Sequence, residues 1–133
     1  RNRLSDLQRT CDILTKLTPL PHEILLTADG CTDGTVAYVK QTYPCYRLTV
    51  NASGKGSVAS RAAMMQQATG ELVLALDDDS YPEQLDCLAT LSEIFQENPR
   101  LAIATFPQRT DEYPESLTQS DFGESTPVRS FAN

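Results

Sequence analysis

The sequence lacks the patterns that are typical of a zinc site, a disulfide framework or a membrane span. Its four cysteines are scattered without a C-x-x-C pair, and His22 is its single histidine. This distribution argues against a zinc ligand set and favours reduced thiols in a cytoplasmic setting. No apolar stretch approaches the roughly 18 residues of a transmembrane segment. The net charge of −7 argues against binding nucleic acid or an anionic membrane through a broad positive field.

The order of apolar patterns along the 133 residues indicates a single α/β domain. Helices are predicted where apolar residues recur at 3–4 spacing, and strands where short apolar runs lie between turn residues. Strands that alternate with helices form a parallel sheet with right-handed crossovers. The predicted strands are 23–28, 46–50, 72–76 and 101–106, and the predicted helices are 4–17, 36–41, 57–68 and 85–94.

Residues 72–80 are the most informative stretch of the chain. Five apolar residues lead directly into Asp77, Asp78 and Asp79. The run predicts a strand buried on both faces, with three acids at its carboxyl end, where α/β proteins bind ligands. On an extended exit, Asp77 and Asp79 project to the same side and suit one hard divalent cation. The alternative is that the acids cap a helix that starts near Ser80.

The turn from Asp29 to Thr35 follows the strand predicted at 23–28. It superficially matches a calcium loop, but the third position is Cys31 and the twelfth is Lys40. Asp29 could accept a hydrogen bond from a nucleobase N–H or a ribose hydroxyl. The alternative is a turn in which Thr32 or Asp33 caps the next helix.

The start of the helix predicted at 57–68 offers positive charge and free backbone amides. Lys55, Gly56 and Arg61 suit a phosphate or diphosphate group. Lys55 is expected to be exposed. Arg61 lies on a helix of small residues, which predicts that its guanidinium reaches inward.

Taken in order, four segments resemble family 2 glycosyltransferases: Asn2-Arg3, residues 23–35, Ser60-Arg61 and residues 76–80. The resemblance covers nearly the whole chain. It implies a Rossmann-like GT-A nucleotide-binding domain with a mainly parallel sheet, truncated at both ends. Residues 1–133 would be the nucleotide-sugar-binding part of one such domain, without its first strand and its acceptor-binding half. The missing strand would leave a slot about 10 Å wide between 23–28 and 72–76.

The resemblance also implies roles for single residues. Asp77-x-Asp79 matches the DxD motif, so Asp79 and Asp77 would bind Mn²⁺ or Mg²⁺. The implied nucleotide-binding residues are Asp29, Arg61, Asp77 and Asp78. The family commonly has aspartate where this chain has Ala28, so Asp29 would take over the base contact or base selection would be looser.

The implied reaction moves a sugar from a UDP-, GDP- or dTDP-sugar to a hydroxyl of a saccharide or lipid-linked acceptor. Its catalytic base is expected beyond Asn133. One alternative is a haloacid-dehalogenase-type phosphatase, which also has D-x-D after an apolar strand. Another is a non-catalytic nucleotide-binding module. The expected location is cytoplasmic, or peripheral to a membrane in the full-length protein.

Overall fold

A computed structural model describes residues 1–106 of the chain. The chain divides into two compact units, Arg1–Glu97 and Asn98–Asn133. Residues 107–133 of the predicted domain lie outside the described residues. All the helices and strands given below belong to the first unit.

The first unit alternates helices and strands as the sequence predicts. Its sheet has two strands in the described chain, and they run parallel. The predicted α/β class is therefore confirmed. The elements in chain order are α1 (Leu4–Leu14), β1 (Leu25–Asp29), α2 (Thr35–Thr42), β2 (Arg47–Asn51), α3 (Ser57–Gln67) and α4 (Cys87–Glu97).

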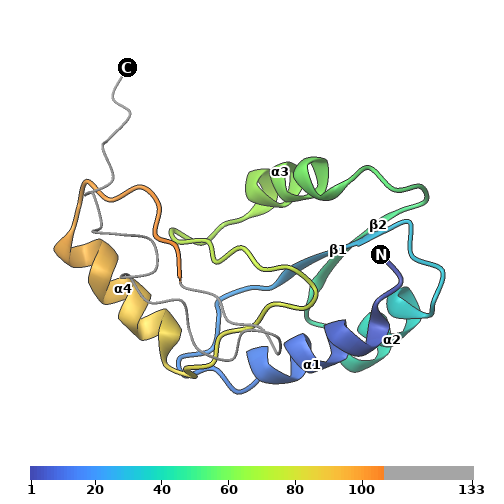
Figure 1. The fold of residues 1–133 in the computed structure, drawn as a ribbon, viewed down its shortest axis with the longest axis horizontal. Coiled ribbons are helices and arrows are strands. Elements are labelled where there is room, and N and C mark those ends of the chain that lie inside the picture. Colours follow the sequence, from blue (N-terminus) through green and yellow to red (C-terminus); the bar gives the residue numbers. More distant parts are fainter. Residues whose placement is uncertain (107–133) are drawn as a thin grey trace, which may run out of the picture. The chain divides into compact units, whose positions relative to one another are not determined.

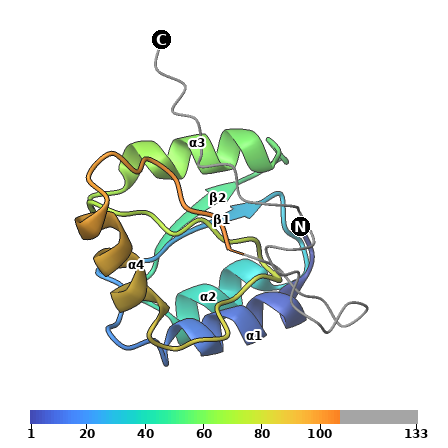
Figure 2. The ribbon, with the colours of Figure 1, turned by 60° about the vertical axis from the view of Figure 1, so that its left-hand side comes forward.

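The sheet lies between helices on both of its faces. α1 and α2 lie on one face and α3 on the other, as two views of the ribbon show (Figure 1, Figure 2). The register pairs Leu25 with Arg47 at one end and Asp29 with Asn51 at the other. Two polar side chains therefore end neighbouring parallel strands at the edge where α/β proteins bind ligands.

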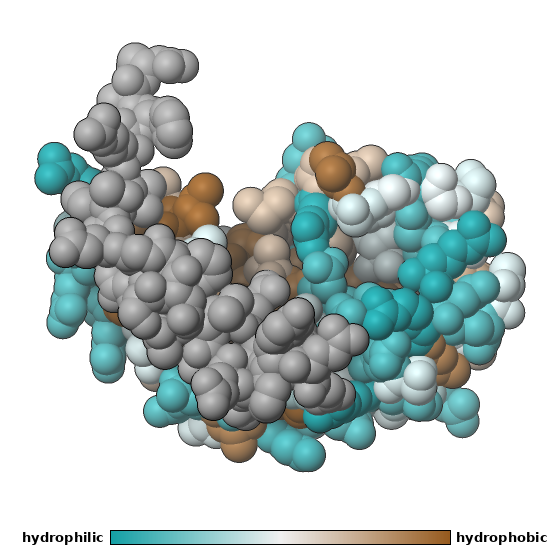
Figure 3. Space-filling model, in the orientation of Figure 1, coloured by the Kyte–Doolittle hydropathy of each residue, from teal (hydrophilic) through white to brown (hydrophobic). Residues whose placement is uncertain are grey.

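The core lies on the α1–α2 side of the sheet. Val39 and Cys11 are fully buried there, and Leu7 and Tyr43 complete the cluster. Burial raises the pKa of the Cys11 thiol to about 11. The opposite helix α3 is less covered, since Val58 is 81% exposed on it, and apolar surface is visible over this helix in Figure 3.

Glu23 ties the start of the sheet to the end of α3. Its Oε1 accepts hydrogen bonds from the backbone N–H of Thr69 at 2.6 Å and from the Thr69 hydroxyl at 2.8 Å. Its Oε2 lies 2.6 Å from the Arg47 guanidinium, which also donates to the Gln67 carbonyl. These donors, the Thr69 amide first, lower the pKa of Glu23 to about 2. The surrounding donors favour the carboxylate form of Glu23.

Residues 72–76 do not form the predicted strand. They are not in a helix or strand, and within residues 1–106 no backbone hydrogen bond joins them to β1. Leu72 is 45% exposed and Val73 48% exposed, so the prediction of burial on both faces is wrong. A strand needs a neighbouring backbone for its ladder, and within residues 1–106 β1 pairs with β2 alone. The open position beside β1 and its width stay predictions.

Residues 101–106 also form no strand, although their apolar run predicts one. The Leu101 N–H donates to the Asn98 carbonyl, which closes a turn, and Ile103 is 72% exposed. Apolar content alone does not supply a pairing partner.

Candidate functional site

The acidic residues Asp77–Asp79 form a turn between α1 and α3, visible in Figures 1 and 2 between the two helices. The Ser80 N–H donates to the Asp77 carbonyl at 3.2 Å, which closes the turn. The exit is therefore not extended, and the expected alternation of the three side chains does not apply. Since α4 begins only at Cys87, the acids do not cap a helix at Ser80.

Two arginines form ion pairs with the carboxylates of this turn. Arg61 Nη2 lies 2.5 Å from Asp77 Oδ1. Arg3 Nη2 lies 2.8 Å from Asp79 Oδ2, and Arg3 Nη1 lies 3.5 Å from Asp78 Oδ1. The clustered carboxylates are thus paired with cations of the chain itself, which relieves their mutual repulsion. Arg61 reaches the turn as a half-exposed side chain, 45% exposed, rather than a buried one.

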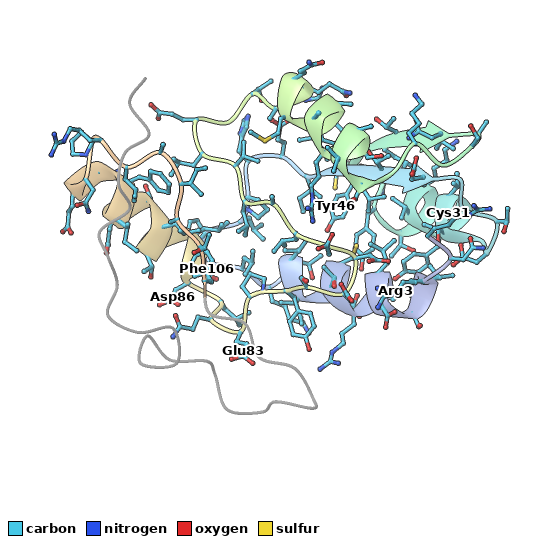
Figure 4. The ribbon with its side chains drawn as sticks, turned by 45° about the horizontal axis from the view of Figure 1, so that its top comes forward. Arg3, Cys31, Tyr46, Glu83, Asp86 and Phe106 are labelled. Atoms are coloured by element: carbon cyan, nitrogen blue, oxygen red, sulfur yellow. The ribbon has the colours of Figure 1, made fainter. Side chains whose placement is uncertain are left out.

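Arg3 is the residue that sequence analysis missed. It entered only as part of a motif, whereas the structure places it directly before α1 (Figure 4), with its guanidinium on Asp79. Its contact with Asp79 spans 76 positions of sequence. The signal that could have found it is charge: three adjacent acids require cations nearby, and Arg3 opens a helix that packs on the same sheet.

Side chains along helix α1 also hold the acidic turn and the segment that follows it. The Thr10 hydroxyl, which is buried, donates to the Asp78 carbonyl at 2.9 Å. The Arg9 guanidinium lies 4.8 Å from the centroid of the Tyr81 ring. Just beyond the helix, the Thr18 N–H donates to the Leu85 carbonyl at 2.7 Å. The segment after the acids therefore follows α1, which fixes where the carboxylates lie.

Asp29 ends β1 and binds the loop that precedes α3. Its Oδ1 accepts from Asn51 Nδ2 at 2.6 Å, and both carboxylate oxygens accept from the Lys55 N–H at 2.9 Å. The Gly56 N–H donates to Oδ2 at 2.9 Å. These donors, the Lys55 amide first, hold the pKa of Asp29 below its ordinary value. Asp29 is thus an anion that positions the start of α3, and each of its oxygens already receives two donors.

Asp33 joins the starts of two helices. Its Oδ1 accepts from the Thr35 hydroxyl at 2.6 Å and from the Thr35 N–H at 3.2 Å, at the beginning of α2. Its Oδ2 accepts from the Leu4 N–H at 3.1 Å, at the beginning of α1. These bonds, the Thr35 hydroxyl first, lower the pKa of Asp33. The N-cap of α2 is Gly34, without a side-chain cap, so Asp33 supports the helix start from the position before the cap.

Asn2 fixes the backbone next to Arg3. Its side-chain amide donates to the Thr32 hydroxyl at 3.1 Å and accepts from the Thr32 N–H at 2.8 Å. Thr32 adjoins Cys31 in the turn after β1 (Figure 4). The start of the described chain is therefore anchored on the turn that follows Asp29.

Helix α3 connects the two predicted parts of the site. Gly56 at its start is bound by Asp29, and Arg61 lies five residues further on and binds Asp77. Five residues advance an α-helix by about 7.5 Å. The meeting of Asp29, Asp77 and Asp79 in a single cleft stays a prediction, but the contacts of one helix link them.

Metal binding at the acidic turn stays a prediction. Within residues 1–106 there is no group of three or more His, Cys, Asp or Glu side chains that could hold a metal ion by themselves. Mg²⁺ at nucleotide sites is held by one or two carboxylates together with substrate phosphates, so a larger cage is not needed. Asp77 Oδ2 and Asp79 Oδ1 accept no hydrogen bond from the described chain.

The parallel strands, the helices on both faces and the polar carboxyl edge define an α/β protein of the nucleotide-binding type. Residues 1–131 match glycosyl transferase family 2, and the chain belongs to this family. No curated protein and no solved structure matches the chain. In the part of the chain that the structure describes, no helix is long and apolar enough to cross a membrane.

Proposed function

We propose that this chain binds a nucleotide-sugar donor at the Asp77–Asp79 turn and takes part in moving its sugar to an acceptor hydroxyl. The observation that carries the proposal is the convergence of Arg3 and Arg61 on this turn in a member of glycosyl transferase family 2. A site that presents both carboxylates and guanidinium groups suits a diphosphate and its counter-ion together. The proposed acceptor is a saccharide or a lipid-linked acceptor.

Asp79 and Asp77 are the proposed ligands for Mn²⁺ or Mg²⁺. Each has one carboxylate oxygen without a hydrogen bond from the described chain. The metal, when bound, supplies Lewis-acid stabilisation of the charge that develops on the departing diphosphate. The contacts of α1 with Asp78 keep the turn in place, so that little rearrangement of the backbone is needed.

Arg61 is the proposed phosphate-binding cation. Its guanidinium lies beside Asp77 and is half exposed, so it can donate to a ligand there. Lys55 contributes its backbone amide to Asp29, and its side chain is exposed as predicted. Asp78 forms an ion pair with Arg3 and remains a proposed nucleotide-binding residue through its place in the turn.

The nucleobase contact of Asp29 is also a proposal. As a carboxylate it can only accept a hydrogen bond, which suits the ring N–H of uracil, thymine or guanine. Because both oxygens are already bound to Asn51 and to the amides before α3, a base would have to replace one of these donors. Without a base contact, Asp29 would still support binding of the nucleotide sugar, because it fixes the start of the helix that carries Arg61.

The family favours glycosyl transfer over the phosphatase alternative. A nucleotide-binding module without turnover is the second candidate, since we assign no catalytic base among residues 1–106. Hydrolysis or transfer of a bound nucleotide sugar would favour the enzyme, and binding without product formation would favour the module.

Calorimetric titration of the protein with UDP-, GDP- and dTDP-sugars, with and without Mn²⁺, tests the proposal. We expect one nucleotide to bind, with higher affinity when Mn²⁺ is present. Arg61→Gln should weaken that binding even at saturating Mn²⁺, whereas Lys16→Gln, the same charge change on an exposed residue, should not. Failure of all three nucleotides to bind would overturn the proposal.

A further inference from the structure

Arg3 binds more carboxylates than any other cation in the described chain. Its Nη2 contacts Asp79 at 2.8 Å, its Nη1 contacts Asp78 at 3.5 Å, and its Nε contacts Asp6 at 3.0 Å. These acids raise the pKa of the guanidinium, with Asp79 the largest cause. A single side chain therefore spans two of the three acids in the turn.

The position of Arg3 conflicts with a divalent cation. Asp79 Oδ2 is engaged by the guanidinium, so a metal on the same carboxylate would lie a few ångströms from a fixed positive charge. Like charges at that separation repel even in a solvated site. A cation that binds Asp79 must therefore displace Arg3 or bind against its charge.

The backbone that carries Arg3 is held in place, and its side chain is partly exposed to solvent. Asn2 is bound to Thr32 and the Leu4 N–H to Asp33, so both neighbours of Arg3 are anchored. The Arg3 side chain is 45% exposed. Asp6, three residues along the same helix, already accepts from Nε and can keep the guanidinium when its other contacts break.

We propose that Arg3 is an ionic lock on the acidic turn: it holds Asp78 and Asp79 when no metal is bound, and a divalent cation opens it. The proposal rests on the metal-binding role proposed above for Asp77 and Asp79. It assigns Arg3 a regulatory effect on the same site, because the affinity for the cation is set in part by the competing guanidinium. Arg3 is a positioning residue and needs no contact with the donor.

The test is the affinity for Mn²⁺ alone, measured by calorimetry and by the spin-resonance signal of free Mn²⁺. Arg3→Gln should bind Mn²⁺ about fivefold more tightly than the unmodified protein at low salt, since it removes the competing charge. Arg3→Lys retains the charge without the guanidinium fork and should fall between the two. Lys16→Gln changes the net charge equally and should stay within about twofold of the unmodified protein.

Each outcome decides a different claim. Equal or weaker Mn²⁺ binding by Arg3→Gln, with the protein folded by circular dichroism, would overturn the lock while leaving the metal site intact. If Arg3→Gln does not fold, Arg3→Lys alone decides, and unchanged affinity in that variant overturns the lock. Failure of the unmodified protein and Arg3→Gln to bind Mn²⁺ at all would overturn the metal site and the lock together.

Discussion

Gly30 lies where β1 ends and the chain must pass close to the loop before α3. It has φ +65°, a conformation that side chains rarely adopt, and a Cβ built there would lie 2.8 Å from the Gly54 N atom. Gly34 has φ +88°, but its Cβ would meet nothing nearer than a Leu4 methyl at 4.0 Å. A side chain would therefore strain the backbone at both glycines, but its Cβ would collide with neighbouring atoms only at Gly30.

Gly30→Ala should destabilise the fold more than Gly34→Ala does. The left-handed conformation costs an alanine about 1–2 kcal/mol at either position. The overlap with Gly54 adds about 1–3 kcal/mol at Gly30, because backbone rather than a flexible side chain must move. We expect a loss of about 2–5 kcal/mol for Gly30→Ala and about 1–2 kcal/mol for Gly34→Ala.

Urea denaturation followed by circular dichroism measures both losses in the same protein. Gly30→Ala should also weaken nucleotide binding in the folded protein, since moving Gly54 disturbs the Lys55 and Gly56 amides that Asp29 holds. Equal destabilisation by the two variants would show that the close approach of Gly54 has no energetic weight, and the reasoning would fail.

Three further perturbations test other contacts. Thr10→Val removes the hydroxyl that donates to the Asp78 carbonyl. The variant should lose about 1 kcal/mol of unfolding free energy in urea denaturation and should bind nucleotide less tightly in the presence of Mn²⁺. Thr10→Ser keeps the hydroxyl and should retain the stability and the nucleotide affinity. Val39→Ala removes two buried methyl groups and should cost about 1.5–3 kcal/mol without changing nucleotide affinity in the folded protein. The pKa of Glu23 falls from 4.5 to about 2 on folding, so its stabilisation is full above pH 4.5 and is lost as the pH falls toward 2. The free energy of unfolding should therefore depend less steeply on pH across that range in Glu23→Gln than in the unmodified protein. An equal dependence on pH in both proteins would refute the stabilising role of the Glu23 carboxylate.

The sequence predicted the helices and the first two strands because their apolar spacing and turn residues are local signals. It failed at residues 72–76 and 101–106, where the composition suits a strand but the described chain supplies no paired backbone. Strand formation depends on a neighbour that the run itself does not contain. Composition alone could not predict that Leu72 and Val73 would be exposed.

Sequence analysis singled out the acids of the candidate site and one of the two arginines that pair with them. Arg61 contacts Asp77 although the strand predicted before the acids does not form, because helix α3 brings its guanidinium to the turn. Arg3 was not assigned a role, since its partner is far away in sequence. Asp29 was placed at the right edge, but its bonds to Asn51 and to the loop amides required knowledge of the strand register.

The central claim is that the Asp77–Asp79 turn binds the donor through a divalent metal. The most direct test is the affinity for whichever of UDP, GDP or dTDP binds, measured by calorimetry with and without Mn²⁺ in the unmodified protein and in Asp79→Ala. Asp79→Ala should retain its fold, because its ion pair with Arg3 is largely exposed to solvent. We predict that Mn²⁺ raises the affinity of the unmodified protein and leaves that of Asp79→Ala unchanged. An equal gain from Mn²⁺ in both proteins would contradict the claim.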